Sequence, residues 1–244
     1  MKKIVIFTGA GISAESGVQT FRDAKTGLWN NHNIDDVATI SGWRKNRELV
    51  LNFYNELRTS MPNFEPNDAH KALVELEEEY DVKIITQNVD DLHERAGSKN
   101  IIHLHGELTK ARGAIYDHKS SPADNVIDIG YKEIKIGDKC PLTGSQLRPH
   151  IVWFGEYPFG VSEACEAISQ CDILLIIGTS LQISYTLDVL NKVKRSTIDN
   201  NGCDIYYIDP KPMHYLDNYG LTVNYVDKKA VEGVREIVNK LKIK

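Results

Sequence analysis

The stretch Ile4-Val5-Ile6-Phe7-Thr8-Gly9-Ala10-Gly11-Ile12-Ser13 joins an apolar run to a glycine-rich turn. Continuous apolar residues predict a strand that is buried on both faces, as in a parallel sheet. A glycine-rich turn after such a strand lets the backbone approach a phosphate closely, and a helix that starts there offers unpaired N–H groups. The stretch therefore predicts a nucleotide-binding turn at the start of an α/β protein.

The residues after this turn do not continue as they do in dehydrogenases. There, a helix leads to a second strand that ends in an acidic residue about 20 positions further on. Here the chain passes through Phe21-Arg22-Asp23 to Gly27-Leu28-Trp29-Asn30-Asn31, which is polar and typical of a loop. A glycine-rich turn alone can also be a tight connection, so its interpretation depends on the rest of the chain.

Further apolar runs recur along the chain, each bounded by turn residues. They lie at residues 82–86, 101–104, 151–154, 173–177, 205–208 and 221–226. Helical patterns lie between them, at residues 69–80, 161–170 and 230–241. This alternation predicts an α/β fold, a Rossmann-like open parallel sheet with helices on both faces.

Two stretches interrupt the alternation and predict a smaller module built from two insertions. Residues 24–68 contain a helical pattern at 47–60, and residues 109–149 are rich in charge, glycine, serine and proline, with a candidate strand at 131–136. We therefore assign residues 1–23, 69–108 and 150–244 to a Rossmann-like domain. Residues 24–68 and 109–149 are assigned to the small module.

Composition limits the classes of function. The 244 residues are 41% hydrophobic, which is enough for a sizeable core, and the formal net charge is -5. This charge argues against binding nucleic acid through bulk electrostatics. The first apolar run is too short for a signal peptide, and no run is long enough to cross a membrane. We expect a cytoplasmic protein without nucleic-acid or membrane partners.

Polar clusters follow five predicted strands at their carboxyl ends, where open α/β sheets bind ligands. They are Thr8-Gly9-Ala10-Gly11, Thr86-Gln87-Asn88-Val89-Asp90-Asp91, His103-Leu104-His105-Gly106-Glu107, Gly178-Thr179-Ser180 and Asp209-Pro210. Each has a simpler interpretation when taken alone. Asn88 and Asp90 would cap a helix, and His105 would be a turn histidine. Their convergence on one edge of the sheet favours a shared binding site.

The ordered motifs resemble those of the sirtuins, the NAD-dependent protein deacylases. The matching segments are Gly-Ala-Gly-Ile-Ser from residue 9, Glu-Ser-Gly from 15, Phe-Arg-Asp from 21, Thr-Gln-Asn-Val-Asp from 86, His-Leu-His-Gly-Glu-Leu from 103, Leu-Arg-Pro from 147, Val-Trp-Phe-Gly-Glu from 152 and Gly-Thr-Ser from 178. They cover almost the whole chain. The resemblance, which is to the short bacterial members, implies that the chain consumes NAD, deacylates lysine side chains of proteins, and releases nicotinamide and O-acyl-ADP-ribose.

The resemblance also implies roles for individual residues. His105 and Asn88 would be catalytic, with His105 the general base that acts through the ribose hydroxyls. Asn88 and Asp90 would hold the nicotinamide carboxamide. The full set implied to bind NAD is Gly9, Ala10, Gly11, Ile12, Ser13, Glu15, Phe21, Arg22, Asp23, Trp29, Gln87, Asn88, Val89, Asp90, His105, Gly178, Thr179, Ser180 and Asp209. The set implied to bind the acylated substrate is Tyr54, Arg58, Val152, Trp153, Phe154, Gly155 and Glu156.

The chain departs from the family at its usual zinc site. Sirtuins bind a structural zinc through two Cys-x-x-Cys pairs, and the positions that align with them here are Gly113, Tyr116, Cys140 and Thr143. One thiolate cannot make a closed tetrahedral site, so we predict no zinc. The module would instead be held by apolar packing of Ile115, Tyr116, Ile127, Ile129 and Tyr131.

A second departure concerns the acyl group. Sirtuins that remove succinyl or malonyl groups carry Tyr-x-x-Arg, whereas here Arg58 follows Tyr54 at the fourth position. Residues four apart lie on one face of a helix, so Arg58 would still reach the acyl pocket. The alternative is a solvated helix charge. Three activities stay open: deacylation (of acetyl or of succinyl and malonyl groups), ADP-ribosyl transfer or NAD hydrolysis, and NAD sensing without turnover.

Overall fold

The main sheet contains six parallel strands in the order β3-β2-β1-β7-β8-β9. The computed structural model describes residues 1–19, 32–114, 125–182, 192–193, 202–214, 216 and 221–243. The strands are β1 (Lys3–Thr8), β2 (Asp81–Thr86), β3 (Ile101–His103), β7 (Ile173–Ile177), β8 (Asp204–Ile208) and β9 (Val223–Val226). Every residue of β7 is buried, as expected where both faces are covered. The predicted Rossmann-like parallel sheet is confirmed.

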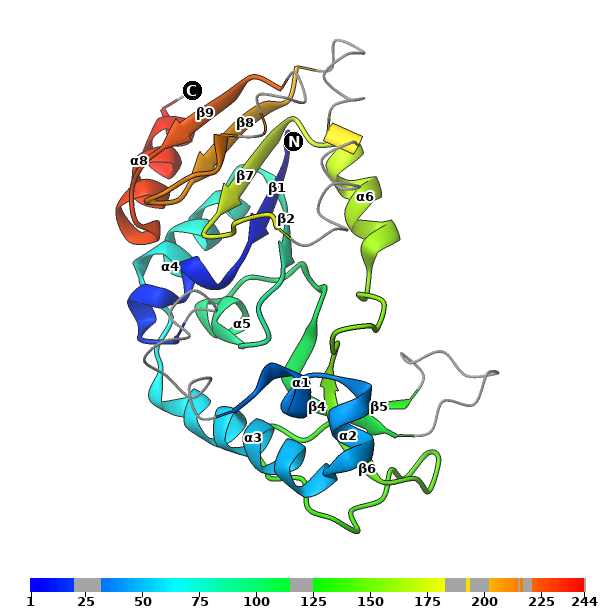
Figure 1. The fold of residues 1–244 in the computed structure, drawn as a ribbon. Helices are drawn as coiled ribbons and strands as arrows, with labels where there is room; N and C mark the ends of the chain where they lie inside the picture. Colours follow the sequence, from blue (N-terminus) through cyan, green and yellow to red (C-terminus); the bar gives the residue numbers. More distant parts are fainter. Residues whose placement is uncertain are drawn as a thin grey trace.

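Helices cover both faces of this sheet (Figure 1). On one face, α4 (Asp68–Glu75) and α8 (Ala230–Lys242) pack in a core that includes Leu73 and Ile237. On the other face, α6 (Val161–Ser169) packs through Ala164 and Ile168. The buried residues of α8 recur every three or four positions, which is the pattern of an amphipathic helix. Among the described residues, every helix is too short or too polar to span a bilayer.

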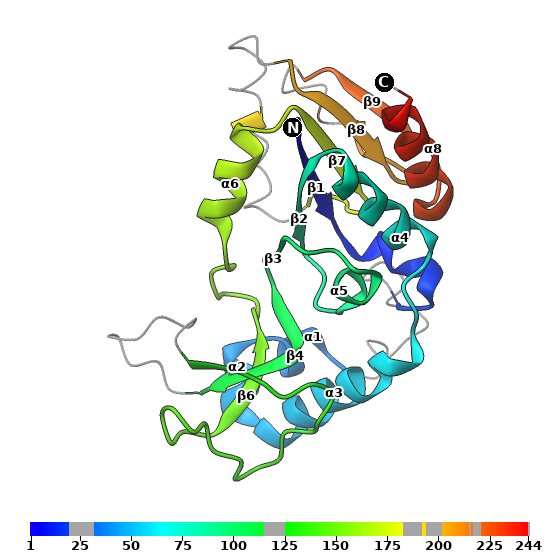
Figure 2. The same cartoon turned by 180° about the vertical axis from the view of Figure 1, so that it is seen from behind.

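A second, smaller layer lies beyond the carboxyl edge of β3 (Figure 2). It contains the antiparallel strands β4 (Gly106–Gly113), β5 (Val126–Asp128) and β6 (Leu147–Ile151) in the order β5-β4-β6, together with α1 (Ile34–Val37), α2 (Ile40–Lys45) and α3 (Arg47–Ser60). Its core centres on Trp43 and Trp153, whose ring centroids are 5.6 Å apart. Two chain segments that are distant in sequence therefore share one core.

The prediction that the apolar run at 151–154 forms a covered parallel strand is wrong. The strand there is β6, which ends at Ile151 and pairs antiparallel with β4. A short apolar run does not specify its partner strand. Here Ile151 lies opposite Gly106, the first residue of β4.

The candidate strand at 131–136 is also wrong, because this stretch is not a strand in the structure. Ile134 is buried, and its backbone N–H and C=O bond to the side chain of Asn55 on α3, at 2.9 and 2.8 Å. One amide thus provides both hydrogen bonds that a neighbouring strand would have provided. The Tyr131 hydroxyl donates to Asp91.

The helix predicted at 69–80 is α-helical only to Glu75 and continues as the short 3₁₀ helix η6 (Leu76–Glu78). Three acidic residues, Glu77, Glu78 and Glu79, stand at this end. Negative charge is unfavourable next to the negative end of a helix dipole, which favours early termination. The helices predicted at 47–60, 161–170 and 230–241 match α3, α6 and α8 to within one residue at each end.

Three of the positions that align with the family's zinc ligands lie together in the structure. A side-chain carbon at Gly113 would lie 2.4 Å from Thr143 Oγ1 and 3.3 Å from Cys140 Cβ. The loop is closed instead by hydrogen bonds: Thr143 Oγ1 lies 2.7 Å from Ser145 Oγ, and the Cys140 N–H donates to the Ser145 carbonyl at 2.7 Å. Tyr116 lies outside the described residues, as does Ile115. The absence of zinc stays a prediction.

Two histidines that belong to none of the predicted catalytic or binding sets are buried beside the sheet. The rings of His70 on α4 and His93 on the helix α5 (Leu92–Ala96) are 4.9 Å apart, and His93 Nε2 lies 3.1 Å from the hydroxyl of Thr8. Burial lowers the pKa of His70 to about 4 and that of His93 well below its ordinary value. Both rings are therefore neutral in the folded protein at neutral pH.

This burial predicts a loss of stability in mild acid. An unfolded histidine takes up a proton near pH 6.5 and folded His70 only near pH 4, so the free energy of unfolding falls between these values as pH falls. The slope for one such group reaches about 1.4 kcal/mol per pH unit. Urea unfolding at pH 7 and pH 5 measures it. His70→Asn should reduce the difference between the two pH values, whereas replacement of the exposed His214 should not; equal slopes in all three proteins would contradict the prediction.

Candidate functional site

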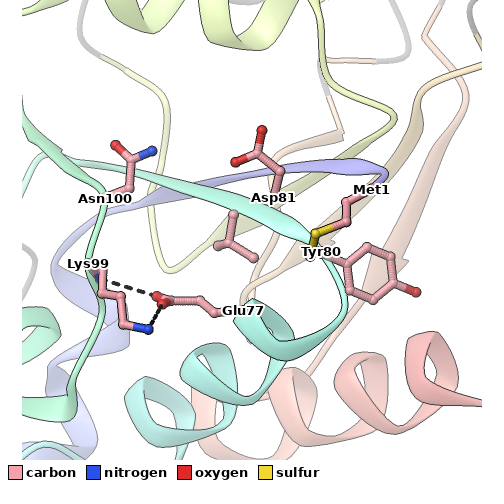
Figure 3. Close-up of a pocket in the computed structure, with 7 residues that line it drawn as sticks. Met1, Glu77, Tyr80, Asp81, Lys99 and Asn100 are labelled. Atoms are coloured by element: carbon pink, nitrogen blue, oxygen red, sulfur yellow. Dashed lines mark hydrogen bonds and ion pairs between the residues drawn. The ribbon is translucent and has the colours of Figure 1, made fainter.

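A surface hollow lies at the amino-terminal ends of β1 and β2 and contains none of the predicted site residues (Figure 3). It is lined by Met1, Tyr80, Asp81 and Asn100 among others, and Lys99 pairs with Glu77 at its rim. Ligands of parallel α/β sheets bind at the opposite edge, where the strands end. A nucleotide site is therefore expected at the carboxyl edge.

The register of the sheet brings the carboxyl ends of five strands to that edge. Thr8 pairs with Thr86 of β2 and with Ile177 of β7. Ile177 pairs with Ile208 of β8, and Thr86 pairs with His103 of β3. The polar clusters that follow these strands consequently begin side by side.

The glycine turn, residues 9–13, packs directly against the turn that follows β7. A side-chain carbon at Gly9 would lie 2.7 Å from Thr179 Cβ, and one at Gly11 would lie 2.6 Å from Gly178 Cα. The Gly11 N–H donates to the Gly178 carbonyl at 2.8 Å. Glycine is required at both positions because the two backbones touch.

The expected helix with unpaired N–H groups is wrong for this turn. The chain forms two 3₁₀ turns instead, η1 (Ala10–Ile12) and η2 (Ala14–Ser16). Four of its N–H groups bond to carbonyl oxygens within the protein: those of Gly9, Gly11, Ile12 and Ser13. The Gly9 bond goes to the end of β7, the Gly11 bond joins the two turns, and the Ile12 and Ser13 bonds lie within the glycine turn, so these four N–H groups already have carbonyl partners.

Ser13, Asn88 and Asp90 form a buried polar group at the centre of the edge. The Ser13 hydroxyl donates to Asp90 Oδ2 at 3.0 Å, and the Asn88 side-chain amide donates to Ser13 Oγ at 3.2 Å. Burial raises the pKa of Asp90 to about 6, although bonds from the Leu92 N–H and Ser13 oppose the shift. The Leu92 bond, at 3.2 Å, also makes Asp90 a partner of the first residue of α5. Amide, hydroxyl and carboxyl groups together can donate to and accept from a carboxamide.

His105 is oriented by the backbone of the neighbouring loop. Its Nδ1 lies 2.7 Å from the carbonyl oxygen of Gln87, which only accepts, so Nδ1 carries the proton and Nε2 the lone pair. Burial lowers the pKa of His105 despite this bond. The side chain of Gln87 accepts from the Thr179 hydroxyl at 2.6 Å, which links the loops after β2 and β7. A neutral, oriented imidazole is the form that a general base requires.

The loop after β7 contains a strained residue. Leu181 is buried and has a φ of 55°, in the left-handed region that residues other than glycine and asparagine rarely adopt. The Thr179 hydroxyl accepts the Leu181 N–H at 3.2 Å, and the Tyr207 hydroxyl donates to the Thr179 carbonyl at 2.6 Å. Such strain persists only where neighbouring contacts fix the backbone, and it is common at functional sites.

The remaining residues of the predicted NAD-binding set lie in different surroundings and make different contacts. The buried Asp209 accepts the Lys211 N–H through Oδ1 at 2.8 Å and lies at the end of β8. Glu15 accepts the Val231 N–H at 2.9 Å, at the start of α8, so its carboxylate caps a helix. Val89 packs against the core of the small module, and Ser180 is half-buried. Phe21, Arg22, Asp23 and Trp29 lie outside the described residues.

The segment 152–156 leaves β6 beside His105 and the start of α2. The Val152 N–H donates to the His105 carbonyl, and the Phe154 N–H to that of Ala38, both at 2.9 Å. Trp153 is buried, whereas the side chain of Phe154 is 57% exposed. The exposed Phe154 thus lies two residues after Val152, whose N–H bonds to the backbone of His105.

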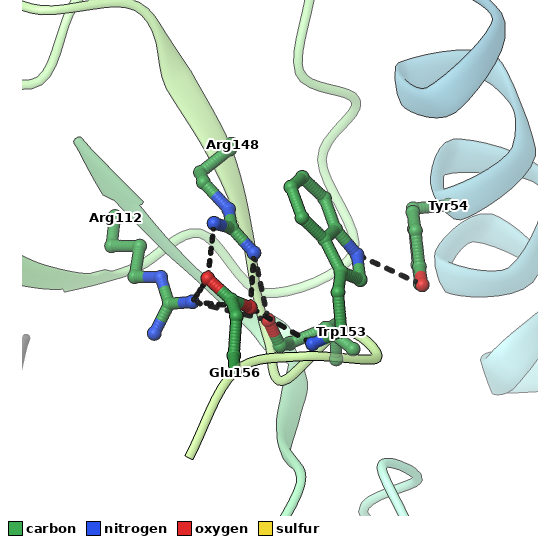
Figure 4. Close-up of polar contacts among 6 residues, drawn as sticks. Tyr54, Arg112, Arg148, Trp153 and Glu156 are labelled. Carbon is green, nitrogen blue, oxygen red and sulfur yellow. Dashed lines mark hydrogen bonds and ion pairs between the residues drawn. The ribbon is translucent and has the colours of Figure 1, made fainter. Parts of the chain in front are cut away.

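Glu156 holds this segment in place (Figure 4). Its two carboxylate oxygens accept from both terminal nitrogens of Arg148, at 2.8 and 2.9 Å, and from Arg112 at 3.2 Å. The backbone N–H of Trp153 donates to the same carboxylate at 2.8 Å. The Arg148 guanidinium stacks on the Trp153 ring, 3.3 Å from the ring centroid. Glu156 therefore serves as an anchor for the loop. Arg148 belongs to the quoted Leu-Arg-Pro motif, but no signal in the sequence indicated Arg112.

Tyr54 and Arg58 are both buried on α3. The Tyr54 hydroxyl accepts from Trp153 Nε1 at 3.1 Å, and burial raises its pKa. Arg58 donates to the Leu108 carbonyl at 2.5 Å and to Asn55 at 2.7 Å. The alternative of a solvated helix charge is wrong, because Arg58 is fully buried. Its Nη2 has no hydrogen-bond partner among the described residues.

The described part of the chain holds one group of three side chains with metal-ligating atoms within 4.8 Å of one another, namely Glu94, His103 and Glu107. Ion pairs already balance its charges, since His103 lies 2.6 Å from Glu94 and Lys110 lies 2.7 Å from Glu107. We therefore assign no metal to this group.

The Arg–Glu anchor predicts a large effect of a small substitution. Glu156→Gln keeps the size of the side chain but leaves two buried guanidinium groups without their shared charge. Breaking a buried ion pair costs roughly 3–5 kcal/mol, which urea unfolding measures. Glu133→Gln, at an exposed pair of the same module, should change stability by less than about 1 kcal/mol. Equal effects of the two substitutions would contradict the anchoring role.

Comparison with known proteins identifies relatives over the full length. The model of the Sir2 family matches residues 9–185. A Helicobacter pylori (strain ATCC 700392 / 26695) protein named NAD-dependent protein deacylase is 46% identical over 243 residues, which is 99% of this chain and 98% of that protein. A Bacteroides thetaiotaomicron protein of the same name is 44% identical over 237 residues, 97% of each chain.

Solved structures agree with these matches. A mutant Sir2 homologue in complex with ADP-ribose superposes with a TM-score of 0.83 at 35% identity, covering 99% of this chain and 92% of the other. A Sir2 homologue in complex with NAD also gives a TM-score of 0.83 at 35% identity, covering 99% and 90%. The shared motifs, the fold and the extent of the similarity lead to one conclusion: this chain belongs to the Sir2 family.

Proposed function

We propose that this chain is an NAD-dependent deacylase that removes acyl groups from lysine side chains of proteins. The relatives at 44–46% identity are named for this activity. The observation that supports the proposal most strongly is the pairing of His105 with the Gln87 carbonyl, one residue before the buried Asn88. A base and a carboxamide-binding group thus lie next to each other at the edge where α/β sheets bind nucleotides.

The donors and acceptors at this edge fit NAD as a consumed substrate. Asn88, Asp90 and Ser13 offer the complementary groups that a nicotinamide carboxamide needs. The Asp209 carboxylate, at the end of β8, is suited to ribose hydroxyls. NAD supplies the ribose carbon that receives the acyl oxygen once nicotinamide has left. The loop contacts through Gln87 and Thr179 keep the two halves of this site in register.

His105 acts in this proposal as the general base. Its neutral form takes a proton at Nε2 from a ribose hydroxyl while Nδ1 stays bonded to the Gln87 carbonyl. Because burial lowers the pKa of His105, the base remains neutral at pH values below the ordinary 6.5. Activity should therefore fall only at pH values lower than that.

The acylated lysine reaches the site along the segment 152–155. The N–H groups of Val152, Trp153 and Phe154 already have partners in the protein, so an extended peptide would pair with the other backbone groups of the segment, with little dependence on its sequence. The exposed Phe154 offers apolar contact to the peptide. Glu156, held by two arginines, keeps the segment in a fixed conformation and is a positioning residue in this proposal.

The removal of His105 tests the assignment. His105→Ala should lower the rate of peptide deacylation at least about a hundredfold, because positioned general bases contribute factors of this size. Mass spectrometry of nicotinamide and deacylated peptide after incubation with NAD measures both products, with an unacylated peptide as the control. Retention of full activity would remove His105 from the mechanism. Nicotinamide release that needs no peptide would indicate NAD hydrolysis, and no release would indicate a sensor.

Arg58 supports a preference for acidic acyl groups within the proposed activity. A buried guanidinium nitrogen without a described partner is costly, and an acyl carboxylate would satisfy it with a charge-assisted hydrogen bond. Tyr54 lies one helical turn before it on α3. We therefore propose succinyl or malonyl lysine, rather than acetyl lysine, as the preferred substrate.

Matched peptides that differ only in the acyl group test this preference. Arg58→Met should lower the ratio of succinyl to acetyl kcat/KM by about tenfold or more, which corresponds to one lost charge-assisted hydrogen bond. Using the ratio cancels any loss of folded enzyme. Arg47→Met, at an exposed position of the same helix, should leave the ratio unchanged. A clear preference of the wild-type chain for acetyl lysine would overturn the proposal and leave Arg58 a structural cation.

A further inference from the structure

A second histidine, His103, contacts the same loop as His105. It ends β3 and pairs in register with Thr86, two residues before Asn88. Its Nδ1 lies 3.2 Å from the carbonyl oxygen of Asn88, and its Nε2 lies 2.6 Å from Glu94 Oε1 on α5. The side chain of His103 is only 8% exposed, and that of Glu94 is 40% exposed. Two histidines on one strand end thus bond to the consecutive carbonyls of Gln87 and Asn88.

The two hydrogen-bond partners of His103 favour one protonation state of its ring. A carbonyl oxygen and an ionised carboxylate both only accept hydrogen bonds, whereas a neutral imidazole has a single N–H. Both contacts are satisfied only when both ring nitrogens carry hydrogen, which makes His103 a cation. His105 needs only one N–H for its bond and stays neutral. The same residue type therefore has two charge states at one strand end.

The charges around His103 support the cationic form. Burial lowers the pKa of His103, but the hydrogen bond and charge of Glu94 and the charge of Glu107 outweigh it, so the pKa is raised. Lys110 pairs with Glu107 at 2.7 Å and tempers that contribution. The other ionisable groups that act on His103, or on which it acts, are Asp90 in the loop, His93 on α5 and His150 on β6.

The loop that His103 contacts is the one that holds Asn88. Backbone bonds fix this loop on two further sides: the Asn88 N–H donates to the Thr86 hydroxyl at 3.0 Å, and the Val89 carbonyl accepts from Leu108 at 2.9 Å. His103 adds the bond to the Asn88 carbonyl and ties it, through Glu94, to the helix α5 that follows. The orientation of the Asn88 side chain toward Ser13 depends on this peptide unit.

We propose that His103, held by Glu94, is a positioning residue that orients Asn88 for binding the nicotinamide end of NAD. The inference rests on the proposed function, because it takes Asn88 as a group that contacts NAD. In this proposal His103 acts through Asn88 and not on NAD directly. Its effect should therefore appear in NAD binding rather than in the chemical step, and it should depend on the proton that the ring carries.

Glu94→Gln tests the proposal through two separate readouts. Removing the carboxylate lowers the pKa of His103, which NMR titration of its ring measures without any activity. In the wild type, the affinity for NAD, from calorimetry, and the KM for NAD should weaken by up to about tenfold as the pH rises above the raised pKa of His103, because a neutral ring has one N–H for two acceptors and no longer ties Asn88 to α5. In the variant, the introduced amide can donate to the second nitrogen of a neutral ring, so both contacts persist and this pH dependence should disappear. The matched control is Glu163→Gln, at an exposed position of α6.

His103→Gln completes the test, since its amide keeps at most one of the two bonds. NAD affinity should fall about tenfold relative to the wild type at pH values below the raised pKa of His103, with kcat changed less than threefold. The proposal is overturned if Glu94→Gln leaves the His103 titration or the pH dependence of NAD affinity as in the wild type. It is also overturned if both variants lose only thermal stability. A wild-type protein that binds NAD but does not deacylate peptides overturns the proposed function alone, because NAD affinity still reports on Asn88.

Discussion

The contact between the glycine turn after β1 and the turn after β7 is the constraint on which the site depends. At Gly9, Gly11 and Gly178 a side-chain carbon would fall within 2.8 Å of the facing turn. This close approach is possible only without side chains, and Gly178 also adopts a positive φ of 60°. It fixes Ser13, the last residue of the glycine turn, within hydrogen-bond distance of Asn88 and Asp90. The polar group at the centre of the edge therefore follows from backbone packing.

Burial and hydrogen bonding divide the ionisable groups of this edge into different charge states. Burial lowers the pKa of His70, His93 and His105 and favours their neutral forms, whereas Glu94 raises the pKa of His103 and favours its charged form. Asp90 has a raised pKa in the same region. Sites that separate the pKa values of similar groups in this way can assign different tasks to them.

Side-chain hydrogen bonds complete the backbone contacts at two places in the small module. Asn55 bonds to both backbone groups of Ile134 and so replaces a neighbouring strand. Around Gly113, hydrogen bonds among Cys140, Thr143 and Ser145 close the loop. The pairing of Glu156 with Arg148 and Arg112 then connects this module to the segment beside His105. Buried ion pairs therefore attach the segment 152–156 to the small module.

The sequence by itself determined the parallel sheet, the edge at which the polar clusters lie and the family, because apolar runs and motif spacing are local properties of the chain. It predicted α3, α6 and α8 to within one residue at each end. Only the tertiary structure decided that the N–H groups of the glycine turn bond within the protein, that Glu15 caps a helix 216 residues away, and that Arg58 is buried. It also decided that residues 131–136 are not a strand and that His103 joins Asn88 to Glu94. Each of these depends on which distant group lies within about 3 Å, and hydrogen-bond energy falls steeply beyond that distance. Such proximity is set by the packing of the whole chain.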